Sequence, residues 1–332
     1  MSTDNQFKSN LNLMDATMLV AGSMIGSGIF IVSADIARNT GSAGWLMAVW
    51  LITGFMTLTA ALSYGELSAM FPKAGGQYIY LREAYNPLVS FVFGWTFFTV
   101  IQTATIAAVG VAFAKFTAYL LPALDEDVIV ADLGFLKISS AQLVSIAVIL
   151  LLTVINTRGV NSGKAVQTSI TVIKIVSLLG LVLFGLLAFD ADVWRTNWLS
   201  GDVWRLQRLE ADGITTSYTS FAALGAIAAG MVGAIFSSDS WHASSSVAGE
   251  IKNPGRNVGL SLALGTIIVT VVYLLTNFMY TGVLTLTEMA GSEKDRVAMT
   301  AAQEIFGPVG ITIIAIMIMV STFGCNNGLI LA

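Results

Sequence analysis

Long apolar stretches recur along almost the whole chain, and they constrain its fold more strongly than any other feature. A helix that crosses a bilayer needs about 20 consecutive, mostly apolar residues. Eight membrane-spanning helices are predicted, at Leu13–Ala37, Gly44–Met70, Leu88–Leu121, Ser139–Asn156, Val166–Phe189, Phe221–Ala248, Val258–Leu284 and Ala298–Ala332. The third is long enough that it must tilt or extend beyond the lipid. The chain is therefore expected to be an all-α membrane protein.

The composition supports this assignment, because 55% of the residues are hydrophobic and only 11% are charged. A soluble domain carries about 25% charged residues, so lipid must face most of this surface. The net charge of −4, without a basic run, argues against nucleic acid as a partner. Because Cys325 and His242 are each the only residue of their type, an internal disulfide and a multi-cysteine or histidine-rich metal site are excluded. We predict neither a metal nor a cofactor.

The segments between the spans help to place the chain in a cell membrane as a multi-pass protein. Pro72–Pro87 mixes charges with tyrosines and predicts a short amphipathic helix at the membrane surface. Asp190–Ser217 is predicted to be a polar loop. With a cytoplasmic N-terminus, lysine and arginine divide seven against seven between the two sides, so the positive-inside rule does not decide the orientation. Seven acids then fall outside, at Asp125, Glu126, Asp127, Asp132, Asp190, Asp192 and Asp202. Acids are a weak topology signal, and we expect the N-terminus in the cytoplasm.

The first predicted span is unfit for a continuous helix, because it contains Gly22, Gly26 and Gly28. Each glycine costs a helix about 1 kcal/mol relative to alanine. If the helix opens here, its free N–H groups need a polar partner in the hydrocarbon. The half-helix that starts after Gly28 would also point the positive end of its dipole at the gap, which suits a carboxylate. Close helix packing through small residues is an equally open explanation.

The sixth predicted span has a second break, in which serines, Asp239 and His242 interrupt the apolar run from Phe236 to Ser246. A charged group at membrane depth costs about 2.5–3.5 kcal/mol on insertion scales, so Asp239 should face a cavity or a partner. A polar helix interface and a helix-capping role for Asp239 remain open. Breaks in spans one and six have the offset expected when two five-helix repeats pair their first helices.

Lys174 is a second charge inside a predicted span, about 12 Å from its start at 1.5 Å per residue. An ammonium this deep needs backbone carbonyls or a carboxylate as partners, and carbonyls near Gly26 and Ser27 are the expected ones. Snorkelling of the side chain to the surface is the alternative.

Four segments of the chain resemble signatures of a known transporter superfamily. Gly22–Phe30 (GSMIGSGIF), Tyr64–Tyr80 (YGELSAMFPKAGGQYIY) and Glu250–Val258 (EIKNPGRNV) are similar to signatures of the amino acid–polyamine–organocation (APC) superfamily. Phe236–Trp241, together with Lys174, resembles its L-type amino acid transporter (LAT) branch most closely.

This resemblance implies the LeuT-like fold, in which two inverted five-helix repeats usually lie within twelve helices. Residues 1–332 would then form one transporter domain with about 8 of 12 helices, a first repeat at about 13–189 and an incomplete second repeat at about 221–332. On this expectation the chain is truncated at its C-terminal end.

The resemblance also implies a permease or exchanger that moves amino acids by alternating access without sodium. In similar transporters, N–H groups corresponding to Ser27 and Gly28 bind the substrate carboxylate. Carbonyls corresponding to Met24, Phe236 and Asp239 bind its amino group. Lys174 stands where sodium-coupled relatives hold a cation, and Phe236 corresponds to an aromatic gate. The candidate substrate site comprises Met24, Ile25, Gly26, Ser27, Gly28, Phe236, Asp239 and Ser240.

Two positions depart from the family pattern. Position 239 is usually glycine in the animal L-type carriers, so Asp239 adds a charge near the substrate amino group and bears on substrate choice. Gly259 stands where proline is common, and a softer start to the seventh span is expected.

The residues bear on two functions other than transport. An intramembrane aspartyl protease needs a second buried aspartate beside Asp239, and no other span carries one, so we predict that the protein is not an enzyme. A transporter-like receptor that binds an amino acid without moving it stays open.

Overall fold

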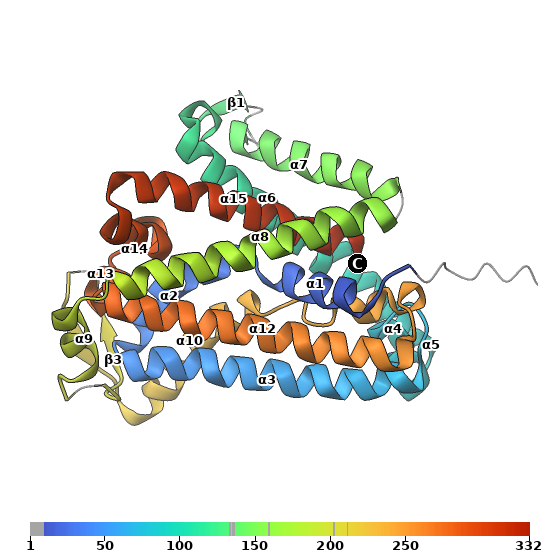
Figure 1. The fold of residues 1–332 in the computed structure, drawn as a ribbon, viewed down its shortest axis with the longest axis horizontal. Helices are drawn as coiled ribbons and strands as arrows, with labels where there is room; N and C mark the ends of the chain where they lie inside the picture. The colour runs from blue at the N-terminus through green and yellow to red at the C-terminus, as the bar shows by residue number, and fades with distance from the viewer. Residues whose placement is uncertain (1–9, 133, 135–136, 159, 202, 211) are drawn as a thin grey trace, which may run out of the picture.

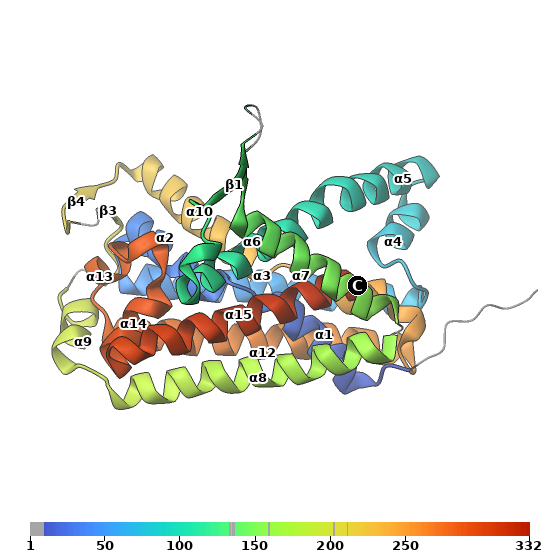
Figure 2. The same ribbon diagram turned by 90° about the horizontal axis from the view of Figure 1, so that it is seen from above.

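The computed structural model describes residues 10–132, 134, 137–158, 160–201, 203–210 and 212–332. It is a bundle of long helices that run roughly along one axis (Figures 1 and 2). The helices long and apolar enough to cross a membrane are α3 (Ala43–Met70), α5 to α6 (Pro87–Leu120), α7 (Ser140–Thr157), α8 (Val160–Leu187), α10 (Ser220–Ser237), α12 (Pro254–Val283) and α15 (Pro308–Leu331).

An eighth span is formed by two shorter helices, α1 (Leu13–Met24) and α2 (Gly28–Thr40), which meet at a bend of 45°. The described residues therefore form seven continuous spans and one broken span. This confirms the prediction of a helical membrane protein with eight spans.

The third span stays continuous despite its length. It consists of α5 (Pro87–Thr96), a π-helical turn (Phe97–Gln102) and α6 (Thr103–Leu120). The Thr103 hydroxyl donates to the Phe98 carbonyl, five residues back, at 2.6 Å. A π-turn of this kind changes the direction of the following side chains and is frequent at functional sites.

The eighth predicted span, Ala298–Ala332, begins too early. Its first part is a separate helix, α14 (Val297–Phe306), and the membrane span α15 starts at Pro308. The two helices are separated by Gly307, whose φ of +68° interrupts the helix. Glycine adopts this conformation at little cost, and proline is favoured at the first turn of the next helix.

The segment Asp190–Ser217 is more ordered than the predicted polar loop. Asp190 caps the short helix α9 (Ala191–Trp198) by accepting from the N–H groups of Asp192 and Val193. Strands β3 (Gln207–Leu209) and β4 (Thr215–Ser217) then form an antiparallel hairpin. A second hairpin joins β1 (Ile129–Asp132) and β2 (Lys137–Ser139). The sequence did not indicate these elements, because they are too short to produce a periodic hydrophobic pattern.

The remaining elements are short and lie near the ends of the spans. They are α4 (Gln77–Ala84), the 3₁₀ turn η2 (Pro122–Leu124), α11 (Ala243–Ser246), the 3₁₀ turn η3 (Ala248–Glu250), α13 (Leu286–Ala290) and the 3₁₀ turn η4 (Glu293–Asp295). α4 is the expected short helix between the second and third spans.

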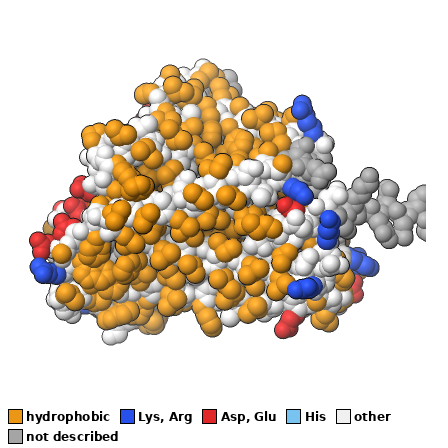
Figure 3. All heavy atoms as spheres, in the orientation of Figure 1, with side chains coloured by type: hydrophobic (Ala, Val, Ile, Leu, Met, Phe, Trp, Pro, Cys, Tyr) orange, Lys and Arg blue, Asp and Glu red, His pale blue; other side chains and the backbone are white. Residues whose placement is uncertain are grey.

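The two ends of the bundle carry different elements. One end holds α4 and the start of α12, and the opposite end holds α9, α13 and the hairpin β3–β4 (Figures 1 and 2). We call them the α4 end and the α13 end. α1 lies toward the α4 end and α2 toward the α13 end (Figure 1). Hydrophobic side chains cover the broad face between the ends, where charges are sparse (Figure 3), as a lipid-facing surface requires.

The seventh span does not have the softer start expected from Gly259. Helix α12 begins earlier, at Pro254, and Gly259 lies inside it. An ideal Cβ at Gly259 would lie 3.1 Å from the Cα of Gly65 on α3, so two facing glycines let these helices approach closely. The glycine therefore serves packing between α3 and α12.

Candidate functional site

The first span is broken as its glycines predicted. α1 ends at Met24, and Ile25 adopts an extended backbone with ψ of 94° before α2 starts at Gly28. No described residue accepts a hydrogen bond from the N–H groups of Gly26 or Ser27. Gly28 is the first residue of α2, so its N–H has no partner within the helix. Three consecutive N–H donors are thus available at the positive end of the α2 dipole.

The carbonyl groups of the same break are held by Lys174. Its Nζ atom donates to the carbonyls of Gly22 at 2.5 Å and Ile25 at 2.7 Å, and lies 3.3 Å from that of Ser321 on α15. Lys174 is only 2% exposed, so the snorkelling alternative is wrong. The expected carbonyls near Gly26 and Ser27 are confirmed in part: Ile25 precedes Gly26 directly, whereas Gly22 lies one turn earlier on α1, and Ser321 comes from α15.

Three further side chains satisfy the other carbonyls of the break. The Ser321 hydroxyl donates to Gly26 at 2.9 Å, and the Cys325 thiol donates to Ser23 at 3.0 Å. The Tyr273 hydroxyl of α12 lies 3.1 Å from the Met24 carbonyl. The carbonyl side of the break is therefore occupied by the protein itself, whereas the N–H side is free.

The second break lies between α10 and α11. α10 ends at Ser237, and Ser240 takes a left-handed backbone with φ of +67°, which is uncommon for a residue other than glycine. The Asp239 N–H donates to the Phe236 carbonyl at 3.2 Å. The Asp239 carboxylate forms no hydrogen bond or ion pair with a described residue, so the structure gives no support to the capping role.

Tyr273 links the two breaks. Its hydroxyl lies 3.0 Å from the Ser237 carbonyl as well as 3.1 Å from that of Met24. One O–H group can donate to only one of them at a time, so the bond can pass from one break to the other without a large movement. The breaks also touch at Gly28, where an added Cβ would overlap the Ser237 hydroxyl group.

A small cavity of about 30 Å³ lies between the breaks and α6. Seven of the eight predicted site residues line it, namely Met24, Gly26, Ser27, Gly28, Phe236, Asp239 and Ser240. Ile25 is the exception, because its side chain is 0% exposed and packs in the core. Its carbonyl contributes indirectly by binding Lys174.

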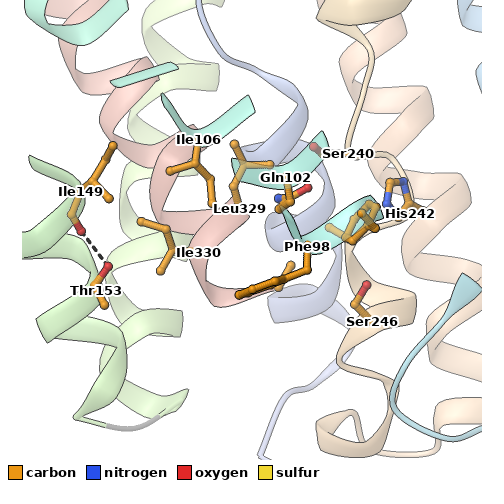
Figure 4. A pocket seen from close by; sticks show the side chains of 13 residues that line it. Phe98, Gln102, Ile106, Ile149, Thr153, Ser240, His242, Ser246, Leu329 and Ile330 are labelled. Atoms are coloured by element: carbon orange, nitrogen blue, oxygen red, sulfur yellow. Dashed lines mark hydrogen bonds between the residues drawn. The ribbon is translucent and has the colours of Figure 1, made fainter. Parts of the chain in front are cut away.

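A larger cavity of about 360 Å³ adjoins the small one and shares Ser240 and Leu329 with it. Figure 4 shows its polar groups, including Gln102 and His242, among apolar side chains of α6, α7 and α15. The residues Ala243 and Ser246 place this cavity on the α11 side of the second break, toward the α4 end.

Sequence reasoning missed several residues of the site. Thr105 and Val109 line the cavity one turn apart on α6. Tyr273, Ser321 and Cys325 donate to the first break from α12 and α15. Val109 is apolar, and the other four are weakly polar side chains inside predicted spans, where such groups usually bond to their own helix. The opened helix does imply that its carbonyls need donors, but only the three-dimensional structure shows which side chains supply them.

A helical membrane protein whose two broken spans meet at a polar cavity has the architecture of a secondary transporter. Comparison with known proteins identifies the family: residues 11–332 match the model of the amino acid permease family, and the chain belongs to it. This confirms the resemblance to the APC superfamily.

Relatives in the LAT-like branch cover almost all of this chain. The serine/threonine exchanger SteT of Bacillus subtilis is 29% identical over 99% of the chain and 67% of its own length. The b(0,+)-type amino acid transporter 1 of Mus musculus is 28% identical over 97% of the chain and 60% of its own length. The cystine/glutamate transporter of Homo sapiens is 27% identical over 97% of the chain and 59% of its own length. The chain thus spans about three fifths to two thirds of the length of these relatives.

Proposed function

We propose that this chain forms the substrate-binding part of an amino acid permease or exchanger that works by alternating access and does not require sodium. The observation that carries the proposal is that the carbonyl groups of the first break are hydrogen-bonded within the protein, whereas its N–H groups are not. Lys174 and other side chains occupy its carbonyls, while the N–H groups of Gly26, Ser27 and Gly28 remain free beside a cavity. An anionic group is the ligand that such donors bind.

The substrate carboxylate would bind these N–H groups. Backbone donors at a helix N-terminus hold a carboxylate by charge-assisted hydrogen bonds and by the helix dipole. Because these donors are backbone groups, they suit the α-carboxylate, which all amino acids share. The selection among amino acids would then come from other residues around the two cavities.

The amino group would bind on the side of the second break. The carbonyl acceptors there include that of Phe236, which lies at the end of α10 and also accepts from the Asp239 N–H. The Asp239 carboxylate lines the same cavity, where it interacts electrostatically with His242 and forms no hydrogen bond or ion pair with a described residue. An unpaired carboxylate favours a ligand with positive charge, so Asp239 should strengthen binding of the ammonium group or of a cationic side chain.

Lys174 would replace a coupling sodium ion. Three carbonyl oxygens from α1 and α15 surround its ammonium, which is an arrangement that a metal cation can also satisfy. Unlike sodium, a covalently attached ammonium cannot leave, so it cannot bring the energy of an ion gradient into the cycle. Exchange or facilitated flux, driven by the substrate gradients alone, is the expected behaviour.

The proposal includes the arrangement of the chain in a cell membrane. The α4 end would face the cytoplasm, together with the N-terminus, and the α13 end would face outward. Residues 13–189 would form the first repeat, and residues 221–332 part of an inverted second repeat.

Reconstitution of the full-length protein into liposomes tests the function. Vesicles loaded with one unlabelled amino acid should take up a labelled amino acid by counterflow, in a screen of all twenty. Saturable binding without counterflow would instead identify a receptor that binds an amino acid without moving it. The absence of both would contradict the proposed function.

A further inference from the structure

The outer half of the first span is fastened at the α13 end by one arginine. The Nη2 atom of Arg38, in the last turn of α2, lies 2.8 Å from the Asp295 carboxylate. Its Nη1 atom donates to the Ala290 carbonyl at 2.8 Å. Asp35, one turn earlier on α2, is a more distant partner at 3.8 Å. Arg38 thus ties α2 to the segment Leu286–Asp295, which contains α13 and η4 and which we call the α13 lid.

The contact uses a free acceptor at the end of a helix. Ala290 is the last residue of α13, and the carbonyls of a final helical turn have no partner within the helix. A guanidinium satisfies such a carbonyl and also interacts favourably with the negative end of the helix. Arg38 therefore binds both a fixed carbonyl and a carboxylate of the lid.

The carboxylate partner sits on strained backbone. Lys294 and Asp295 have φ angles of +50° and +64°, a left-handed conformation that is uncommon for residues other than glycine. Such conformations persist where the surroundings hold them. The ion pair to Arg38 is a contact that helps to hold Asp295 in this position, so its loss should release the end of the lid.

Below the lid, α2 is tightly packed toward the candidate site. Ile29, Ala34 and Ala37 are each 0% exposed, and the Ser33 hydroxyl donates to Asn277 of α12 at 2.5 Å. The larger cavity lies on the opposite side of the breaks, toward the α4 end. Access to the site from the α13 end requires α2 to separate from these neighbours and from the lid.

We propose that Arg38 is a gating residue, whose bonds to Asp295 and Ala290 hold the α13 end closed and break when the site opens to that end. This inference rests on the proposed transport by alternating access. The side chains of Arg38 and Asp295 are 28% and 51% exposed, and exposed ion pairs contribute modestly. A modest contribution suits a gate, because both states must be populated for turnover.

Accessibility of Cys325 tests the gate without any measurement of transport. This thiol lines the cavity between the breaks and is 4% exposed. With Cys325 as the sole thiol of the full-length protein, a membrane-impermeant maleimide is applied to right-side-out and, separately, inside-out vesicles. Arg38→Gln and Asp295→Asn should each raise the labelling rate from the α13 face by about two- to fivefold. Labelling from the α4 face should fall.

Two further variants separate a gate from a general loss of structure. Arg195→Gln removes an exposed ion pair to Asp192 at the same end of the molecule but leaves α2 untouched, so labelling should not change. The charge swap Arg38→Asp with Asp295→Arg should return labelling toward the unsubstituted rate. Unchanged labelling in both single variants, or a swap that labels no more slowly than they do, overturns the gate. Because the assay needs no substrate, that outcome is distinct from a failure of the proposed transport.

Discussion

The Nζ atom of Lys174 lies 2.7 Å from the carbonyl oxygen of Ile25, although 149 residues separate the two in sequence. This contact joins α8 to the opened end of α1, and the same ammonium reaches Gly22 and Ser321. The carbonyls of the break thereby gain partners in a region from which water is excluded. The contact explains how the first span can stay open while its N–H groups remain available to a ligand.

Lys174→Ala should lower the initial rate of uptake by at least about tenfold. The substitution leaves buried carbonyls without a donor, at a cost of about 1–3 kcal/mol for an unsatisfied group. Lys115→Ala is the matched control, because Lys115 forms a half-exposed ion pair with Glu126 at 3.1 Å and touches neither break. Near-normal uptake by well-expressed Lys174→Ala protein would contradict a role for the lysine at the site.

Gly28→Val should abolish amino acid binding and leave membrane insertion intact. Even a Cβ atom at this position would lie 2.5 Å from the Cβ of Ser237, so the larger side chain must push the two breaks apart. Gly180→Val on α8 provides the control, since an added Cβ there meets nothing within 4 Å. Equilibrium binding of amino acids to the two purified variants is the measurement. Unchanged affinity in Gly28→Val would contradict a substrate site formed by these backbone N–H groups.

Asp239→Gly should change the ranking of substrates without a general loss of transport. Removal of an unpaired carboxylate from the cavity should weaken competition by cationic amino acids, relative to neutral ones, by about tenfold or more, because opposite charges a few ångströms apart interact strongly. Competition assays against one labelled neutral substrate measure the ranking. Asp132→Asn in the exposed β1–β2 hairpin should leave it unchanged. An identical ranking in Asp239→Gly would show that the side chain takes no part in selection.

Tyr273→Phe should slow transport by about two- to tenfold, which corresponds to the net loss of one buried hydrogen bond of about 0.5–1.5 kcal/mol. The effect should be on the turnover number more than on affinity, because the hydroxyl contacts carbonyls of both breaks and not the cavity itself. Tyr280→Phe removes a longer contact, 3.4 Å to the Ile29 carbonyl, and should have a smaller effect. Equal effects of the two substitutions would argue against a special role for Tyr273.

The parts of the molecule that the sequence could predict are those in which local pattern and physical necessity coincide. Apolar length located the spans, and Gly22, Gly26 and Gly28 marked the first break because glycine opposes a helix in hydrocarbon. The polar run around Asp239 marked the second break by the cost of burying charge. Both signals are local.

The parts that could not be predicted depend on how distant helices face one another. Nothing in the apolar run around Tyr273 indicates that its hydroxyl reaches two breaks, and Cys325 carries no signal that its thiol bonds to Ser23. Of the partners of Lys174, Ile25 lies beside the expected Gly26, but Gly22 and Ser321 could not be predicted, because the exact point at which a helix opens is decided by tertiary contacts. Only Gly307 and Pro308 mark the separation of α14 from α15 in the sequence, because the residues on both sides are apolar and fit one long span.

The sodium dependence of uptake tests the central claim most directly. Full-length protein is reconstituted in liposomes, and uptake of a bound amino acid is measured with sodium fully replaced by choline at constant pH. If the Lys174 ammonium stands in for the coupling ion, as its contacts with the carbonyls of Gly22 and Ile25 suggest, the initial rate should be the same in both media. A collapse of uptake on removal of sodium would contradict the account.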